Sequence, residues 1–325
     1  MTGVSEGLTR QPMLEGLPVG SESPFSPGSP FAAPIAHLFQ ITLVVCAVIG
    51  IGVTLAIGYS LVAFRSRDGV EPVQRTGNVT LEVIWTAVPI AIVLGLFVLS
   101  IETMTRSDPA ADRAPDLVVV GHQWWWEVRY PCGVVSANEI HVPAGAPLLV
   151  RLESADVIHD FWVPQLARKM DAIPGHPNLF WMSADVAGSY GGTCAEFCGT
   201  QHAWMRLLVI AQSRPEFDAW QTAQLAPALA PAAGAAARGE RTFRDEACGN
   251  CHTIAGRGFE GRVAPDLTHL ESRGTLAAGA TDDTREDLTA WLRDPHAVKP
   301  GCHMPDFKLS EAKVDDLVAY LGELR

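Results

Sequence analysis

Two long apolar stretches without charged residues constrain this chain most. No charged side chain occurs between Glu22 and Arg65, and residues 38–64 read LFQITLVVCAVIGIGVTLAIGYSLVAF; a second charge-free stretch covers 83–101. A bilayer core takes about 20 apolar residues as helix. Two buried helices of a soluble core are the alternative, but charge-free stretches of this length are hard to place there. The sequence therefore predicts a transmembrane helix hairpin over residues 35–106.

The basic residues around these stretches predict their orientation in a bacterial inner membrane. The connecting loop carries Arg65, Arg67 and Arg75, whereas only Arg10 precedes the first stretch and Arg106 follows the second. Because Lys and Arg stay preferentially on the cytoplasmic side, we expect the loop in the cytoplasm. Both termini, and the whole region after the second stretch, are then on the outer side, periplasmic in a Gram-negative cell.

Composition narrows the remaining functions. A formal net charge of −12 argues against nucleic-acid binding and for cationic partners. Four of the seven cysteines lie in two short clusters and no disulfide framework is evident, so we read the cysteines mostly as ligands or attachment points. Residues 1–34 are rich in Ser, Gly and Pro and are predicted to be a disordered N-terminal segment.

Residues 107–220 have the pattern of an all-β domain. Short β-branched or aromatic runs occupy 116–130, 146–153, 178–186 and 205–211, and Gly, Pro and Asn turns separate them. Runs of this kind predict a small sandwich or barrel.

A group of metal-binding side chains falls into this domain. Cys194, Cys198, His202 and Met205 follow one another within CAEFCGTQHAWM, and His159 ends a predicted strand upstream. Two thiolates, two imidazoles and a thioether make a soft site that suits copper. A structural Cys2His2 zinc site and a Cys194–Cys198 disulfide are the alternatives. The thioether adds little to zinc, and zinc has no redox chemistry to share with the second cluster.

The second cluster follows a linker. Alternating Ala and Pro at 221–236 predict an extended, partly rigid connection, and a new domain covers 237–325. Its CGNCH sequence is the c-type heme attachment motif. Cys248 and Cys251 would bind the heme vinyl groups, and His252 would bind the iron. The adjoining histidine and the outer position favour heme c over a redox disulfide or zinc.

The heme iron needs a sixth ligand. Met304 is the only methionine after Met205 and stands in the Gly/Pro loop KPGCHMPDF. The competing donors are His269, His296 and His303. We expect Met304 to be the ligand, because a thioether raises the heme potential relative to a second imidazole.

The final helix supports a small helical domain. Ser310 is a favourable N-cap. Its apolar side chains recur at helical spacing and predict a stripe that packs on the helix containing Phe243. The stripe consists of Val314, Leu317, Val318 and Leu321.

Five blocks resemble one family, in the family's order. LEVIWTAVPI, GHQWWWEVRY, DVIHDFWVP, KMDAIPG and CAEFCGTQHAWM are similar to subunit II of heme–copper cytochrome c oxidases, and the likeness extends to about residue 215. APDLTHL and the methionine loop resemble class I cytochromes c. As a whole, the chain resembles subunit II of a caa-type oxidase, with a cytochrome c domain fused at the C-terminus. The implied fold is a multidomain membrane protein: a two-helix transmembrane hairpin, an all-β cupredoxin domain and an all-α class I cytochrome c domain.

The resemblance also implies a binuclear copper centre, CuA. Two cysteines would bridge the coppers, two histidines would be terminal ligands, the methionine would bind weakly, and a glutamate would bind through its carbonyl. These ligands would be His159, Cys194, Glu196, Cys198, His202 and Met205. The Glu196 side chain would face a magnesium site shared with subunit I.

Two further residues receive roles from the resemblance. Trp124, the first aromatic after GHQ, would be the surface residue through which electrons enter. Here the family's frequent Trp-Tyr-Trp is Trp124, Trp125 and Trp126, and packing in the β-domain is the other reading of this run. Glu82 would stand at the entrance of a proton path into subunit I; an interfacial carboxylate that marks the helix start is its alternative.

The implied function is electron transfer in a terminal oxidase. The fused heme c would pass electrons to CuA and on to subunit I, where oxygen is reduced to water with proton pumping. The implied partners are subunit I, other membrane subunits, and a donor such as a cytochrome c or a bc-type complex. This chain alone should not reduce oxygen, because the catalytic heme and copper would lie in the many-span subunit I. A nitric oxide reductase subunit and a non-catalytic assembly protein are the rival functions.

Overall fold

The computed structural model of the protein describes residues 23–65, 77–108 and 112–325. The chain divides into two compact units. One is Ala33–Pro109, and the other joins Met1–Ala32 with Ala110–Arg325. Arg10, Arg67 and Arg75, on which the predicted orientation partly depends, lie outside the described residues.

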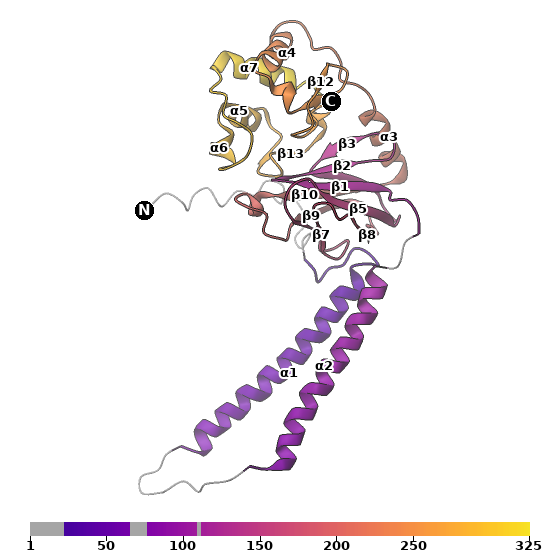
Figure 1. Cartoon of the computed structure of the whole chain (residues 1–325), viewed down its shortest axis with the longest axis vertical. Coiled ribbons are helices and arrows are strands. Elements are labelled where there is room, and N and C mark those ends of the chain that lie inside the picture. The colour runs from indigo at the N-terminus through magenta and orange to yellow at the C-terminus, as the bar shows by residue number, and fades with distance from the viewer. Residues whose placement is uncertain (1–22, 66–76, 109–111) are drawn as a thin grey trace. The chain divides into compact units, whose positions relative to one another are not determined.

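The membrane unit is a pair of long helices, α1 (Ala33–Ala63) and α2 (Val79–Ser107), which contact each other (Figure 1). At 1.5 Å per residue each helix is about 45 Å long, enough to cross a bilayer core of about 30 Å. Most apolar side chains of both helices are exposed, as expected for surfaces that face lipid. Asn78 caps α2 by accepting hydrogen bonds from the Thr80 and Leu81 amides.

The segment before α1 corrects one prediction. We expected disorder throughout residues 1–34, but the described residues from 23 onward are ordered, and α1 already begins at Ala33. Ser29 Oγ donates to the Leu166 carbonyl at 2.7 Å, and the Phe31 ring stacks on Trp181 at 6.0 Å. The Ser/Gly/Pro composition indicated disorder, but burial of the Phe31 ring against Trp181 orders the residues beside it.

The larger unit contains a sandwich of two five-stranded sheets (Figure 1). In the first sheet the order is β3 (Val135–Ala137), β2 (Trp125–Arg129), β1 (Leu117–His122), β5 (Leu148–Ser154) and β8 (Asn178–Met182). In the second the order is β4 (Glu139–Pro143), β10 (Arg206–Gln212), β9 (Gly188–Cys194), β6 (His159–Trp162) and β7 (Met170–Ala172). The predicted β-runs all contain strands, and the domain is cupredoxin-like.

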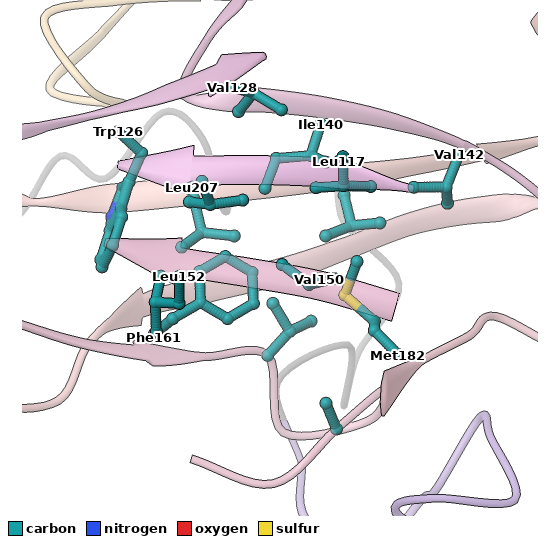
Figure 2. Packing of buried hydrophobic residues seen from close by; sticks show 14 of the residues in the cluster. Leu117, Trp126, Val128, Ile140, Val142, Val150, Leu152, Phe161, Met182 and Leu207 are labelled. Atoms are coloured by element: carbon teal, nitrogen blue, oxygen red, sulfur yellow. The ribbon is translucent and has the colours of Figure 1, made fainter. Parts of the chain in front are cut away.

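The core lies between the two sheets. Side chains from both sheets meet there, and Figure 2 shows Trp126 and Val150 of the first sheet among Phe161 and Leu207 of the second. Burial alternates along β10, the pattern expected for a strand with one face on a core. The loop that carries the predicted copper ligands joins β9 and β10 of this sandwich, so the core fixes both ends of that loop.

The cytochrome domain is helical apart from two short strand ladders. Its helices are α4 (Ala235–Asp245), α5 (Arg285–Arg293), α6 (Pro295–Val298) and α7 (Glu311–Leu321). The ladders pair β11 (Thr253–Ile254) with β12 (Phe259–Glu260), and β13 (Thr275–Leu276) with β14 (Thr281–Asp282). Two Gly-containing turns that fold back on themselves form these ladders, and the helices fit the predicted cytochrome c domain.

The predicted packing of the final helix is confirmed. α7 lies against α4, and all four residues of the predicted stripe are buried beside Phe243 (Figure 1). Ser310 does occupy the N-cap position, but its side chain makes no capping hydrogen bond. Tyr320 is also fully buried.

The segment expected as a linker is partly structured. Helix α3 (Arg214–Gln224) occupies its first four residues. Ala228 is buried, and its amide donates to the Ala255 carbonyl at 2.9 Å, so the middle of the segment packs on the cytochrome domain. The length that remains free to act as a tether is therefore shorter than composition indicates.

Candidate metal centre and heme site

Strand pairing assembles the first cluster. Cys194 ends β9, the loop then passes through a 3-10 turn at His202–Trp204, and Met205 stands directly before β10. His159 reaches the loop because β6 pairs with β9, with Phe161 opposite Cys194. We expected His159 to end a strand, but it begins β6, since residues 155–158 form the bend between β5 and β6.

The donor atoms of the predicted ligands converge. Cys194 Sγ lies 3.7 Å from Cys198 Sγ, 4.0 Å from His159 Nδ1 and 3.2 Å from the Glu196 carbonyl oxygen. Cys198 Sγ lies 3.6 Å from His202 Nδ1 and 3.8 Å from Met205 Sδ. Each sulfur thus has its own histidine and its own weaker donor. That near-symmetry suits two metal ions on a shared pair of sulfurs better than one tetrahedral ion.

The thiols are not joined. A disulfide requires sulfur atoms about 2.05 Å apart, and here the separation is 3.7 Å. The hydrogen bond from the Cys198 thiol lowers the pKa of Cys194, and His159 adds to this effect. A thiolate is the form that binds metal, so the donor chemistry of the cluster fits copper.

The His159 ring is oriented from behind. Its Nε2 lies 2.7 Å from Asp156 Oδ1, which leaves Nδ1 toward the sulfurs. Gly121 makes room for the ring, because a Cβ there would lie 2.8 Å from a His159 ring carbon. A carboxylate behind a ligand histidine fixes its tautomer and its direction.

The second cluster lines a cavity in the cytochrome domain. Cys248, Cys251, His252 and Met304 all face it. Nδ1 of His252 lies 2.7 Å from the Pro265 carbonyl oxygen, as a donor would, so Nε2 remains as the ligand atom. Burial lowers the pKa of His252 and favours the neutral imidazole that binds iron. Thiols, histidine and thioether together around one apolar cavity fit heme c.

The competing sixth ligands separate by position. His269 Nε2 lies 3.0 Å from the Ala226 carbonyl oxygen, and His269 does not line the cavity. His296 is exposed and also lies outside the lining. His303 does line the cavity, but its ring lies on Trp124, with centroids 4.6 Å apart. Met304 also lines the cavity, and its side chain packs on the domain core.

Trp124 connects the two clusters. Its Nε1 donates to the Cys198 carbonyl at 3.0 Å, and the residue lines the heme cavity as well. Gln123 Nε2 donates to the same carbonyl at 2.7 Å. We expected Trp124 on the surface near the copper loop. It does lie at that loop, but it is only 8% exposed because cytochrome residues such as His303 cover it.

The remaining predicted residues lie apart from this assembly. The Glu196 side chain is exposed, although its carbonyl faces Cys194. Glu82 lies in the first turn of α2 and belongs to the membrane unit. Sequence reasoning missed Asp156, Gln123 and Lys299, the last of which is a buried cytochrome residue that contacts Trp124. Gln123 and Lys299 act across elements distant in the chain, so no local pattern marks them. Asp156 stands three residues before His159, and a carboxylate at that spacing was the signal that could have found it.

Fold and sites define a membrane-bound electron-transfer protein with copper and heme c. Three family models match the chain: "Cytochrome C oxidase subunit II, transmembrane domain" at residues 25–103, "Cytochrome C oxidase subunit II, periplasmic domain" at 132–212, and "Cytochrome c" at 236–325. The match to the transmembrane domain and the two apolar helices make the chain an inner-membrane protein.

Similar curated proteins agree with these models. A cytochrome c oxidase subunit 2 of Alkalihalophilus pseudofirmus is 34% identical over 312 residues, which cover 92% of this chain and 90% of that protein. The corresponding protein of Bacillus sp. (strain PS3) is 34% identical, and the match covers 81% of this chain and 80% of that protein. The chain belongs to the cytochrome c oxidase subunit II family, in a form with a fused cytochrome c domain.

One solved structure is also similar in sequence. The periplasmic domain of subunit II of cytochrome oxidase from Bradyrhizobium japonicum is 30% identical. The match covers 35% of this chain and 96% of that one, with a TM-score of 0.34.

Proposed function

We propose that this chain is the electron-input subunit of a terminal oxidase, in which electrons pass from the cytochrome domain to the copper domain and then to subunit I. There oxygen is reduced to water and protons are pumped. The observation that supports the route is the position of Trp124. One side of this residue lines the heme cavity, and its indole donates to the carbonyl of the copper-loop residue Cys198.

The copper ligands proposed for this chain are those whose donor atoms converge. Cys194 and Cys198 would supply thiolates shared by the two coppers, His159 and His202 would each supply an imidazole, and Met205 and the Glu196 carbonyl would be weaker ligands. When bound, the copper pair shares one electron over two ions, so little rearrangement accompanies oxidation or reduction. The protein contributes rigidity, because the donors lie at the ends of β6, β9 and β10 and Asp156 fixes one ring.

Heme c is held in the cytochrome domain by Cys248, Cys251, His252 and Met304. The Pro265 carbonyl directs the His252 ring. Heme c supplies a one-electron couple, and a thioether ligand raises its potential relative to a second imidazole. Apolar side chains around the cavity exclude water and favour the less charged, reduced state.

The partners and the membrane orientation complete the proposal. The copper and heme domains face the periplasm, and the charge of −12 suits a cationic donor such as a cytochrome c; a bc-type complex is the other source of electrons. The exposed Glu196 carboxylate would serve as a ligand on the side of a magnesium site shared with subunit I. Glu82 opens a proton path at the cytoplasmic end of α2.

Metal analysis of the purified chain tests the copper assignment. We expect two coppers per chain and no zinc, together with one heme c. Cys198→Ser should abolish the absorption of the copper pair and leave the heme spectrum intact, because the heme thiols lie in a separate domain. One zinc per Cys194–Cys198 pair would overturn the assignment.

A further inference from the structure

The cytochrome domain covers the copper domain through a surface made of few segments. On the cytochrome side these are residues 273–278 and 299–303, and on the copper side 123–125, 137–139 and 200–206. Trp125, Ala137 and Ala278 form a small buried apolar cluster across it. Two charged side chains are buried in the same surface, one from each domain.

Glu139 is the charge that the copper domain contributes. This residue begins β4, is only 3% exposed, and directs its carboxylate at the cytochrome backbone. Oε1 accepts from the Gly274 amide at 2.8 Å and from the Thr275 amide at 3.2 Å. Two backbone donors of the cytochrome domain therefore depend on an acceptor from the other domain.

Lys299 is the charge that the cytochrome domain contributes, and its contacts mirror those of Glu139. The residue is 4% exposed, and its Nζ donates to the Trp124 carbonyl at 3.1 Å and to the Trp204 carbonyl at 3.2 Å. A third bond, at 2.8 Å, reaches Ala277 within its own domain. Burial lowers the pKa of Lys299 to about 7. The ammonium has one N–H for each of the three carbonyls, whereas the neutral amine has only two N–H donors.

We propose that the cytochrome domain docks on the copper domain in one defined position, held by this exchange of buried polar groups, and that Lys299 and Glu139 are its positioning residues. The inference rests on the proposed relay and specifies how it is arranged. Buried donors and acceptors without partners cost free energy, so a shifted position would leave groups of both domains unsatisfied. Lys299 bonds to Trp124 and to the residue before Met205, and thereby fixes the heme cavity against the copper loop.

Hydrogen exchange of the full-length chain in its oxidase complex tests the docking without reference to electron flow. The Gly274 and Thr275 amides should be protected in the wild type, because they donate to Glu139. Glu139→Leu and Lys299→Met should each speed their exchange by about tenfold or more. Lys313→Met is the matched control, since Lys313 forms a surface ion pair with Glu246 in the same domain; it should change nothing at Gly274.

The heme spectrum distinguishes a loss of docking from a misfolded cytochrome domain. Glu139 lies in the copper domain, so Glu139→Leu should keep the weak far-red sulfur-to-iron band of the ferric heme. Faster exchange with this band intact supports the docking, as does slower heme-to-copper transfer in both variants. Unchanged exchange at Gly274 in both variants would overturn it, even if the relay works. Failure of the wild-type heme to reduce copper would instead overturn the relay and leave the docking result standing.

Discussion

At the scale of single residues, the proposed copper ligands are held by groups that are not themselves proposed to bind metal. Asp156 holds the His159 ring, and Gln123 and Trp124 both donate to the Cys198 carbonyl. The spacing of Cys194, Cys198, His202 and Met205 within one loop made those four residues predictable. Their supports come from other loops and strands, and only the folded sandwich brings them together.

Removing the carboxylate behind His159 should weaken the copper site without removing a ligand. Loss of a carboxylate that orients a ligand histidine costs about 10- to 100-fold in metal affinity, so we expect Asp156→Ala to lower copper affinity by that factor. Titration against a competing chelator measures it. Asp218→Ala, which breaks only a surface pair with Arg214, is the control. An affinity equal to wild type would show that His159 needs no such support.

His141 should make the copper domain sensitive to mild acid. The ring is 8% exposed, stacks on Trp220 at 4.1 Å, and lies 2.9 Å from Gln212 Oε1. Burial lowers its pKa from 6.5 to about 4. Between these values the unfolded chain binds more protons than the folded chain, so stability falls as pH decreases from 6.5 to 4. The total loss from this group is on the order of 3 kcal/mol.

Denaturant unfolding of the outer domains at a series of pH values checks the effect of His141. His141→Phe keeps a ring against Trp220 and removes the titrating group, so its stability should fall less across that pH window. The exposed His176→Phe should leave the slope as in wild type. An equal slope in His141→Phe would assign the acid sensitivity to other groups.

At the scale of elements, the spacing of apolar residues predicted the regular helices and strands. It did not predict which connecting segments are ordered by individual contacts. The two membrane helices, the strand runs of the sandwich and the apolar stripe of α7 all follow from the sequence pattern. The pattern could not show that residues before α1 pack on the sandwich, or that Ala228 of the linker packs on the cytochrome domain. A single buried side chain or backbone hydrogen bond can order such a segment. Composition describes the average over many residues, so it does not indicate where such a contact forms.

The crossing of α4 and α7 depends on a glycine. A Cβ at Gly239 would lie 2.0 Å from the Asp316 carbonyl oxygen of α7. Gly to Ala within a helix normally stabilises by about 0.5–1 kcal/mol, but overpacking costs about 1–3 kcal/mol, and here the obstacle is backbone. We therefore expect Gly239→Ala to destabilise the cytochrome domain.

Thermal unfolding monitored by the heme spectrum measures the stability of the cytochrome domain in wild type and in Gly239→Ala. Arg241→Ala changes an exposed residue of the same helix and should stay within about 0.5 kcal/mol of wild type. A Gly239→Ala domain more stable than wild type would mean that the helices separate at little cost.

At the scale of the whole molecule, the larger unit joins two redox domains that the sequence could only place in order along the chain. The motifs predicted copper and heme c on one side of a membrane. They could not predict that Trp124 would be covered, or that Glu139 and Lys299 would be buried between the domains, because no local pattern marks an interface. A fused, docked donor removes the need for diffusional encounter and raises its effective concentration.

Flash-induced electron transfer from heme c to copper tests the central claim most directly, in wild type and in Trp124→Phe with both sites fully loaded. Phenylalanine keeps an aromatic ring but loses the indole bond to the Cys198 carbonyl. We expect rapid transfer in wild type and markedly slower transfer in the variant, whose domains should remain folded and loaded. An unchanged rate in Trp124→Phe would remove Trp124 from the route, and a wild-type heme that never reduces the copper within one turnover would contradict the relay itself.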